Sequence, residues 1–251
     1  MVCQAARLIE DGKTIFVGYG MPQLAAMLSQ RLYAPDATQV YEFGAIAPQV
    51  ATPFMRFLMA DSRNNNRAIA WQNMNLVMAQ ASGGYIDYGM LGAAQIDPYG
   101  NINSTFAGGT YEEPQRRFSG SGGGNEVASF CWRTILLMEH EKRRFVEKLD
   151  FLTSPGYMDG RRDAREEAGL PAGTGPYRVI TSKGLFDFHP DSRRMRLVGV
   201  AEGLESREVL GDMGFSVLRS ERIEPLRLPK PEELKILRSE IDPDRVILGK
   251  P

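Results

Sequence analysis

The sequence predicts an α/β fold in which an open, mostly parallel sheet is flanked by helices. The first 45 residues read as strand, loop, helix and strand, and such a unit closes by default as a right-handed parallel crossover. Short apolar segments typical of buried strands recur at 88–96, 134–138 and 178–182. The chain has no internal repeat and no clear linker, so residues 1–251 are expected to form a single domain.

Composition excludes several classes of protein. Hydrophobic residues at 43% and charged residues at 24% are ordinary globular values. A net charge of −1 gives no electrostatic footprint for nucleic acid or an anionic membrane. No apolar run approaches the roughly 18 residues that a membrane span needs, and the N-terminus lacks the pattern of a signal peptide. Cys3 and Cys131 lie far apart without a CxxC pattern, so the sequence supports neither a disulfide framework nor a zinc site. We therefore expect a soluble, cytoplasmic protein.

The first elements are marked by their ends as well as by their apolar residues. Val2–Glu10 has an amphipathic pattern and is followed by Asp11-Gly12, a typical helix stop. Thr14–Val17 is rich in β-branched and aromatic residues, which favour a strand. Pro22 stands where proline is tolerated at the start of a helix, so a helix is expected over Gln23–Tyr33.

Thr38–Ala45 carries the first candidate for chemistry. A short strand in this stretch ends directly in Glu42, and Gly44 then permits a tight backbone that a Cβ would obstruct. Since the carboxyl ends of parallel strands share one edge of a sheet, Gly18 and Glu42 are expected to lie together where α/β folds bind ligands. The alternative is a Glu42 that caps a turn or pairs with a surface cation.

The remaining elements are read mainly from short apolar runs and from turn residues. Thr52–Met59 fits either a short helix or a strand. In the middle of the chain we expect a polar loop at Ser62–Arg67, a helix at Leu76–Gly83, strands at Tyr88–Ile96 and Ile102–Thr105 around a turn at Asp97–Asn101, a helical turn at Glu126–Phe130 and a strand at Thr134–Met138. In the C-terminal part we expect a loop over Pro155–Pro176, strands at Arg178–Ser182, Leu185–Phe188 and Met195–Val200, and helices at Glu205–Gly211 and Pro231–Arg238.

Phe118–Asn125 is the most glycine-dense segment of the chain. The backbone N–H groups of such a loop, including those of Gly122 and Gly123, can form a nest for an oxyanion or a phosphate. The glycine spacing is not that of a dinucleotide-binding fingerprint, and a flexible surface loop is the alternative. His140 lies in the charged run Glu139–Arg144 and is a candidate base, but it has no partner at a diagnostic spacing.

Several short motifs, in their order along the chain, resemble those of β-type subunits of class I acyl-CoA transferases. Within that family the resemblance is to the β-type (B) subunits of glutaconate CoA-transferases, and it extends less closely to 3-oxoacid CoA-transferases. Each motif is weak alone, and their shared order carries the resemblance. The motifs are Gly18-Tyr19-Gly20-Met21-Pro22, Tyr33–Asp36, Glu42-Phe43-Gly44, Gly92–Thr105, Arg117–Asn125, Met138–Phe145, Asp150–Gly160 and Val179–Phe188.

The resemblance implies the open α/β, NagB/RpiA-like subunit fold of this family and a nucleophilic glutamate, which falls on Glu42. It implies that the backbone of Gly122 or Gly123, together with Gly44, serves an oxyanion hole or CoA binding. Phe43 departs from the Asn or Ser that usually follows the nucleophile, so it leaves the fine substrate preference open, and it is a candidate residue of the substrate pocket. The chain also begins inside the first helix usual for the family.

The function implied by the resemblance is transfer of CoA between a (di)carboxylic acyl-CoA and an acceptor carboxylic acid. Glu42 would form a mixed anhydride with the acyl group and then a glutamyl-CoA thioester. A carboxylate attacks a thioester effectively only where water is excluded and fixed donors meet the oxyanion. Coenzyme A is then a substrate, and neither a metal nor a bound cofactor is expected.

The implied partner is an α-type subunit, in a heterodimer or a larger assembly such as α2β2 or α4β4, with the active site between the subunits. Two other functions remain open. The same scaffold could serve as a ring-opening CoA-thioester hydrolase or an enoyl-CoA decarboxylase, or the chain could be a non-catalytic partner subunit. Fold similarity alone does not decide among these, but relatives with divergent chemistry tend to lack the glutamate, so Glu42 favours transfer.

Other residues have both a functional and a structural interpretation. Tyr99, Asn101 and Asn103 are candidates for the acyl pocket, although the turn they belong to also explains their residue types. Arg116 and Arg117 are candidates to meet a CoA phosphate or a substrate carboxylate, or else they are solvated. His140 is expected to be structural, because the family chemistry does not need it, and Cys131 is expected to be a small core residue.

Overall fold

A computed structural model describes residues 1–53 and 59–249. The helix or strand expected at Thr52–Met59 falls mainly on 54–58, outside the described residues. The strands are β1 Thr14–Val17, β2 Thr38–Tyr41, β3 Ala45–Ile46, β4 Ala70–Trp71, β5 Tyr88–Gly92, β6 Gln95–Ile96, β7 Ile102–Asn103, β8 Phe106–Gly109, β9 Pro114–Arg117, β10 Arg133–Leu137, β11 Pro176–Ile180, β12 Gly184–Phe188, β13 Met195–Val200 and β14 Leu218–Pro225. The α-helices are α1 Val2–Ala6, α2 Met21–Leu32, α3 Met74–Ser82, α4 Gly124–Phe130, α5 Ala164–Glu167, α6 Ser206–Gly211 and α7 Pro231–Ile236.

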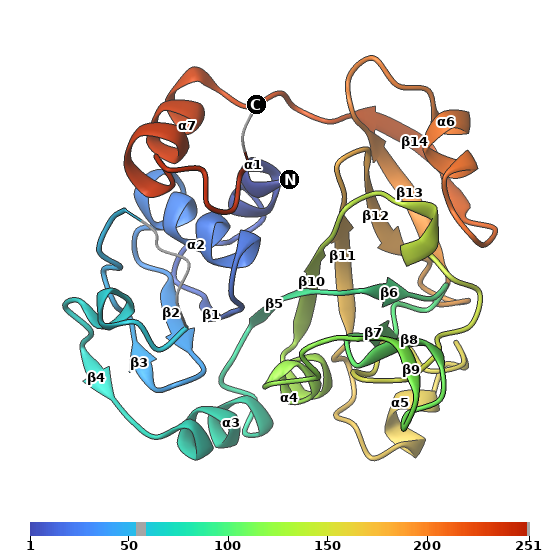
Figure 1. Cartoon of the computed structure of the whole chain (residues 1–251), viewed down its shortest axis with the longest axis horizontal. Helices are drawn as coiled ribbons and strands as arrows, with labels where there is room; N and C mark the ends of the chain where they lie inside the picture. The colour runs from blue at the N-terminus through green and yellow to red at the C-terminus, as the bar shows by residue number, and fades with distance from the viewer. Residues whose placement is uncertain (54–58, 250–251) are drawn as a thin grey trace.

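One large sheet runs through the molecule (Figure 1). Among the described residues it has ten strands in the order β14-β13-β12-β11-β10-β5-β1-β2-β3-β4. Its centre, from β11 to β2, is parallel. Antiparallel pairs extend it on both sides, from β11 to β13 and from β2 to β4. The predicted α/β fold with an open, mostly parallel sheet is confirmed.

Both faces of the central strands are buried. Because successive side chains of a strand point to opposite faces, β1 and β2 contribute to two separate core clusters. Ile15, Val17 and Tyr41 pack in the cluster that holds α1 and α2, and Phe16 and Val40 pack in the cluster that holds α3 and α4. Burial on both faces is typical of a parallel sheet, and it leaves the carboxyl edge of the strands as the place for polar chemistry.

The two ends of the chain pack together, with α7 beside α1 and α2 (Figure 1). Glu233 of α7 has a fully buried side chain. Its Oε1 accepts hydrogen bonds from Arg7 Nε at 2.8 Å and from the Tyr33 hydroxyl at 2.6 Å. This buried carboxylate therefore joins the last helix to the first two.

Tyr88–Ile96, predicted as one strand, forms two. β5 ends at Gly92, after pairing with β1 and β10 on its two sides. The chain then leaves the large sheet, and Ala94 donates its N–H to the carbonyl of Asn103 at 3.0 Å. β6 consequently pairs with β7 in a separate two-stranded sheet. The prediction was wrong because a turn in the middle of the run depends on this distant partner.

Smaller differences also have local causes. α1 ends at Ala6 rather than at Glu10. The polar loop predicted at Ser62–Arg67 contains a short 3-10 helix, which begins where the Asp61 side chain accepts the Arg63 N–H at 2.9 Å. The long loop predicted after Pro155 contains α5. Strands β3, β4, β8, β9 and β14 were not predicted.

No helix in the described part of the chain is both long enough and apolar enough to cross a membrane.

Candidate active site

The cleft at the carboxyl edge of the parallel strands brings the predicted functional segments together. Val17 of β1 is in register with both Tyr41 of β2 and Met90 of β5, so these strands end side by side. Gly18 and Glu42 follow directly and line one cleft of about 620 Å³. The glycine-rich loop, residues 119–124, lines the same cleft. A cleft of this size suits a small-molecule ligand.

Gly44 shapes the turn that holds Glu42 in place. Its φ is +121°, and a Cβ on it would lie 1.7 Å from the carbonyl oxygen of Gln72. Its N–H donates to the carbonyl of Tyr41 at 2.9 Å, and its own carbonyl accepts the Gln72 N–H at 3.1 Å. Only glycine fits this backbone and this close approach. Since its N–H is used within the turn and it does not line the cleft, Gly44 positions Glu42 and does not offer a donor to a ligand.

The Glu42 carboxylate lies against Gly122 and Gly123. A methyl group placed on Gly123 would be 3.1 Å from Glu42 Oε1, and one placed on Gly122 would be 3.7 Å away. Among the described residues, no group donates a hydrogen bond to this carboxylate and no cation pairs with it. The alternative prediction, a Glu42 that pairs with a surface cation, therefore finds no such cation in the described part of the chain.

The glycine loop is held from both sides and leaves two donors free. Gly120 donates its N–H to the carbonyl of Ser104 at 2.9 Å, and Gly124 donates to Ser121 at 2.7 Å. Between these anchors, the N–H groups of Gly122 and Gly123 have no acceptor among the described residues. Free backbone N–H groups in a glycine-rich turn are donors of the kind that can bind an oxyanion, and these two belong to the loop next to the Glu42 carboxylate.

Two arginines and Glu42 are the charged residues among the described lining of the cleft. Arg144 donates its Nε to Glu141 at 2.8 Å and an Nη to the carbonyl of Ala93 at 3.3 Å. Arg116 lies over the ring of Phe118, 5.4 Å from its centroid. Arg144 was not singled out from the sequence, because its charged run is typical of a solvated surface.

Other predicted pocket residues lie elsewhere. Phe43 packs between Tyr41 and Trp71, with ring centroids 5.8 and 5.6 Å away. Tyr99 packs under Gly160, where a Cβ would lie 2.2 Å from the ring. Neither side chain lines the cleft in the described structure. Phe43 thus packs against the end of β2, next to Glu42 in the chain.

Asn103 is fully buried, and the donors and acceptors of its side chain are all paired inside the protein. Its Nδ2 donates to Gln95 Oε1 at 2.6 Å and to the Phe106 carbonyl at 2.7 Å. Its Oδ1 accepts from the Thr105 N–H at 2.9 Å and the Thr153 hydroxyl at 3.3 Å. An amide with all its donors and acceptors paired has none left for a substrate. Asn101 is bonded internally in the same manner.

His140 is buried away from the cleft. Its Nε2 lies 2.9 Å from the Val209 carbonyl, which can only accept, so this nitrogen carries the proton. Its Nδ1 lies 3.0 Å from the Thr181 hydroxyl, which is also 3.0 Å from the Gly184 carbonyl. Burial lowers the pKa of the imidazole below its ordinary value. The expectation that His140 is structural is consistent with this setting.

Cys131 is fully buried under β5, and burial raises the pKa of its thiol to about 12. It is a core residue, as predicted. Within residues 1–53 and 59–249, no cluster of three acidic, histidine or cysteine side chains is placed to hold a metal ion.

The sequence reasoning missed some cleft residues besides Arg144. Ser104 and Ser154 both line the cleft, and Ile102 forms part of its apolar wall. The motif Gly92–Thr105 contains two of these residues, but only the folded chain shows which of its side chains face the cleft.

Comparisons with known proteins agree with this site. The family model for coenzyme A transferases matches residues 1–210. The B subunit of glutaconate CoA-transferase from Acidaminococcus fermentans is 37% identical, with 98% of this chain and 92% of that protein covered. The B subunit of 3-oxoadipate CoA-transferase from Pseudomonas knackmussii is 32% identical, with 95% of this chain and 90% of that protein covered.

The fold agrees as closely as the sequence does. The crystal structure of glutaconate coenzyme A-transferase from Acidaminococcus fermentans has a TM-score of 0.90 to this chain at 34% identity, with 100% of this chain and 96% of that chain covered. The match therefore extends over the whole sheet and both of its flanks. The chain belongs to the coenzyme A transferase family and is one of its β-type subunits.

Proposed function

We propose that this chain is the β-type subunit of a two-subunit enzyme that moves CoA between a dicarboxylic acyl-CoA and an acceptor carboxylic acid, with Glu42 as the nucleophile. The observation that carries the proposal is the Glu42 carboxylate, unpaired among the described residues, lying against the backbone of Gly122 and Gly123, whose N–H groups have no acceptor in the same part of the chain. Glutaconate and 3-oxoadipate, the acids in the names of two relatives, are both dicarboxylates. Residues 1–251 would act as one domain around the continuous sheet.

The reaction needs only this carboxylate, the two substrates and fixed donors. Glu42 attacks the thioester carbonyl, the C–S bond breaks, and CoA thiolate leaves behind an acyl-glutamyl anhydride. The thiolate then attacks the glutamyl carbonyl, which releases the first acid and forms a glutamyl-CoA thioester. The acceptor carboxylate attacks that thioester, and the released thiolate finally takes the new acyl group and restores Glu42. The N–H groups of Gly122 and Gly123 would stabilise the oxyanions, each donor being worth on the order of a hundredfold in rate.

An α-type subunit would complete the site. Both relatives are named as B subunits, which implies a second, A-type chain, and Arg116 in the lining of the cleft is exposed to solvent in this chain. An anhydride survives only where water is kept out, so a second wall is needed. The isolated chain should therefore be inactive, and co-expression with an α-type subunit from the same genome should give a stable, active complex in gel filtration. A fully active, monodisperse single chain would disprove this partner.

The nucleophile is tested by trapping the intermediate. The complex is incubated with glutaryl-CoA in the absence of an acceptor acid and is then treated with borohydride, which reduces a glutamyl thioester to an alcohol. Peptide mass spectrometry should place the change within Thr38–Ala45. Glu42→Gln keeps the size of the side chain but removes the anion, so it should lose the adduct and lower transfer by at least about a thousandfold.

The Glu42→Asp variant is the matched control for position. It retracts the carboxylate by one methylene, and a misplacement of about 1 Å can cost roughly a hundredfold in rate. Transfer at the wild-type rate by Glu42→Gln would show that the nucleophile is wrongly assigned. Hydrolysis or decarboxylation of a CoA ester by the wild type, without an acceptor and without an adduct, would favour the alternative chemistries instead.

A further inference from the structure

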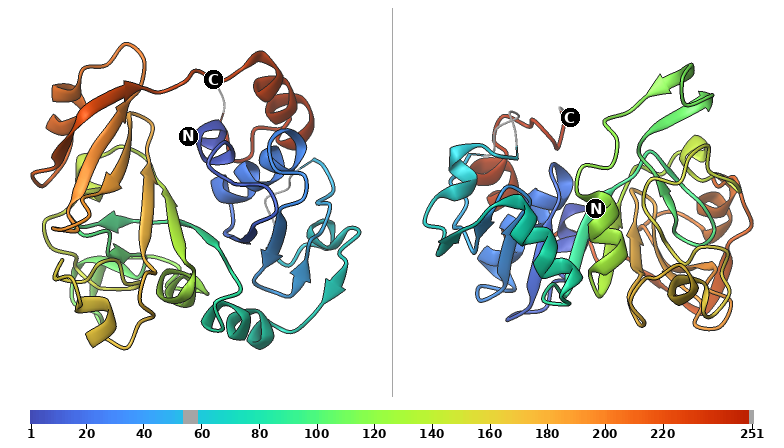
Figure 2. Two further views of the ribbon diagram at one scale, coloured as in Figure 1. Left: turned by 180° about the vertical axis from the view of Figure 1, so that it is seen from behind. Right: turned by 90° about the horizontal axis from the view of Figure 1, so that it is seen from below.

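Arg116 and Arg117 are neighbours in sequence but point to opposite faces of the β8–β9 hairpin. This hairpin extends from the body of the molecule, as the right-hand view of Figure 2 shows. Phe106 pairs with Arg117, and Ala107 pairs with Arg116. Since side chains alternate along a strand, Arg117 shares a face with the buried Phe106, and Arg116 shares the other face with Phe118.

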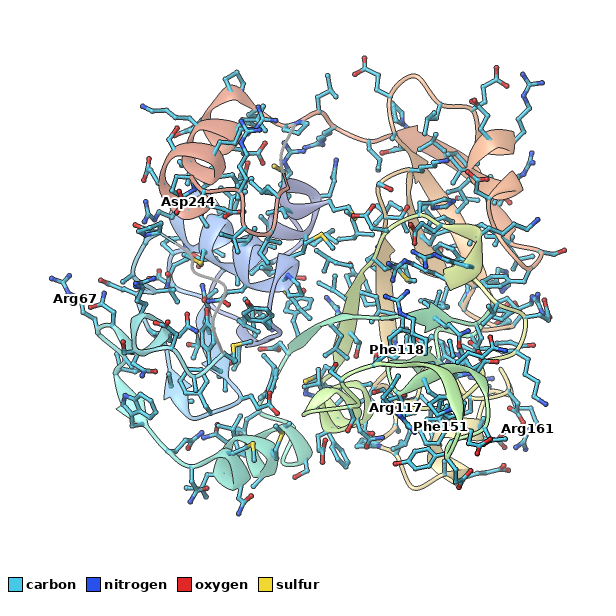
Figure 3. All side chains as sticks on the ribbon, in the orientation of Figure 1. Arg67, Arg117, Phe118, Phe151, Arg161 and Asp244 are labelled. Carbon is cyan, nitrogen blue, oxygen red and sulfur yellow. The ribbon has the colours of Figure 1, made fainter. Side chains whose placement is uncertain are left out.

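Arg117 is held by the hairpin itself. Its guanidinium lies 4.7 Å from the centroid of the Tyr111 ring and 5.7 Å from that of Phe106, and it donates to the Tyr111 carbonyl. Phe106 packs on Phe151, which lies on the same side of the molecule as Arg117 (Figure 3). Arg117 does not line the cleft in the described structure, so its role is to support the hairpin.

Arg116 faces the cleft and is available for a ligand. It lines the cleft together with Phe118, over whose ring its guanidinium lies. Among the described residues it makes no hydrogen bond and no ion pair. The contact with Phe118 restricts the guanidinium without using its donors, because a cation–π contact leaves the N–H groups free. A planar fork of donors held in this way matches the geometry of a carboxylate.

We propose that Arg116 forms a subsite for the second carboxylate of a dicarboxylic acyl group, whose thioester carbonyl faces Glu42. The inference rests on the proposed function of Glu42 and adds to it the reason why a diacid is preferred. Arg144, the other cation of the cleft, already donates to Glu141 and Ala93. Arg116 is therefore the arginine of the cleft whose donors are all free within the described structure.

The size of the cleft favours a carboxylate over a CoA phosphate as the ligand of Arg116. A cleft of about 620 Å³ is in the size range that holds a small ligand, such as a five- or six-carbon diacid with its thioester. The pantetheine arm alone, with its two amide units, extends at least about 10 Å beyond the sulfur before the diphosphate begins. With the thioester at Glu42, the proposed acyl group would occupy the cleft beside Arg116, and the diphosphate would begin at least about 10 Å beyond the sulfur.

The test compares glutaryl-CoA with butyryl-CoA, which differ in the distal carboxylate. Dissociation constants are measured by calorimetry on the αβ complex carrying Glu42→Gln, which binds without turnover. Adding Arg116→Gln should weaken glutaryl-CoA binding by about 10- to 100-fold and should change butyryl-CoA binding by less than about threefold. Arg116→Lys keeps the charge but loses the planar fork, so it should recover part of the selectivity. Arg117→Gln, the matched control, should leave the ratio of the two constants unchanged.

Each other result overturns the subsite. An equal loss for both ligands would mean that Arg116 binds a phosphate of CoA, and no loss for either would mean that it is a solvated arginine. Dissociation of the complex on gel filtration would place Arg116 in the subunit interface. Because binding is measured without turnover, a failure to trap an adduct on Glu42 would disprove the proposed reaction but would leave this comparison intact.

Discussion

The surroundings of Glu42 and of Asn103 are both rich in polar groups, but they differ in how completely those groups are paired. Asn103 makes four hydrogen bonds inside the protein. Glu42 makes none among the described residues, and the N–H groups of Gly122 and Gly123 beside it are also free. A polar group that the fold pairs completely stabilises the fold, whereas groups left unpaired together in a cleft are available to a substrate.

The cleft that holds Glu42 and the enclosed site of Asn103 meet within one short stretch of the chain. Ile102 and Ser104, the neighbours of Asn103, line the cleft, and Asn103 between them does not. The alternation of side chains along the chain thus separates a wall residue from a supporting residue at consecutive positions. Variants of residues in the cleft wall should therefore affect activity, and variants of the supporting residues should affect stability.

Among variants that leave Glu42 itself unchanged and probe this boundary, the largest expected effect is on activity, from Gly123→Ala. The added methyl would lie 3.1 Å from Glu42 Oε1 and 2.6 Å from the terminal carbon of Met78. The flexible Met78 can move, but the carboxylate would be displaced, and displacements of this kind can lower kcat/KM by about a hundredfold. The φ of Gly123 is negative, so unfolding in urea should change by less than about 1 kcal/mol.

Gly124→Ala is the control for that variant. Its methyl would meet Ser154 Oγ at 3.6 Å, an ordinary contact distance. The loss of activity should therefore be much smaller than for Gly123→Ala. Comparable rates for the two variants would show that the reaction does not depend on the close approach of Gly123 to the Glu42 carboxylate.

A smaller effect, on stability, is expected from Asn103→Ala. The change leaves Gln95 Oε1, the Phe106 carbonyl and the Thr105 N–H without their present partner. We expect a loss of about 2 kcal/mol in the free energy of unfolding, measured in urea, with kcat of the folded complex nearly unchanged. A large fall in kcat with unchanged stability would instead restore Asn103 to the acyl pocket.

The smallest expected effect concerns His140, a paired polar group like Asn103. Burial lowers its pKa in the folded state, so the unfolded chain takes up a proton at higher pH than the folded chain. The contribution of the neutral His140 to the free energy of unfolding is fully present above the pKa of the unfolded state, near 6.5. It is lost as the pH falls below that value. Between pH 7 and pH 5, the free energy of unfolding in urea should therefore fall less for His140→Gln than for the wild type.

The contribution of Asp97 to stability changes with pH in the opposite direction to that of His140. Both proteins in the comparison must therefore retain Asp97. Burial raises the pKa of its carboxyl to about 6, so its contribution to stability falls as the pH rises through that value. The difference between wild type and His140→Gln cancels this contribution. An unchanged pH dependence in the variant would show that His140 is not the group responsible.

Local signals in the sequence were sufficient for the framework of the site. The strand Thr14–Val17, the helix opened by Pro22 and the strand before Glu42 are all marked by their own residues. Their order requires a parallel crossover, which brings Gly18 and Glu42 to one edge. The glycine-dense segment was likewise recognisable, and both Gly122 and Gly123 line the cleft.

Other features depended on partners far away in the chain. The eight-residue strand β14, Leu218–Pro225, carries mostly exposed side chains and exists because its backbone pairs with β13. The break after Gly92 depends on pairing with Asn103. No local pattern marks either feature, because an edge strand or a change of sheet is decided by the available backbone partner rather than by its own residue types.

The sequence by itself therefore determined the fold class, the family resemblance and the position of Glu42 at the carboxyl edge. The tertiary structure alone decided that Asn103 is enclosed while Ser104 faces the cleft, and that Arg116 faces the cleft while Arg117 packs on the hairpin. The physical reason is the two-residue period of extended chain. A shift of one residue in register would exchange these faces, and register is set by the strands and loops against which each segment packs.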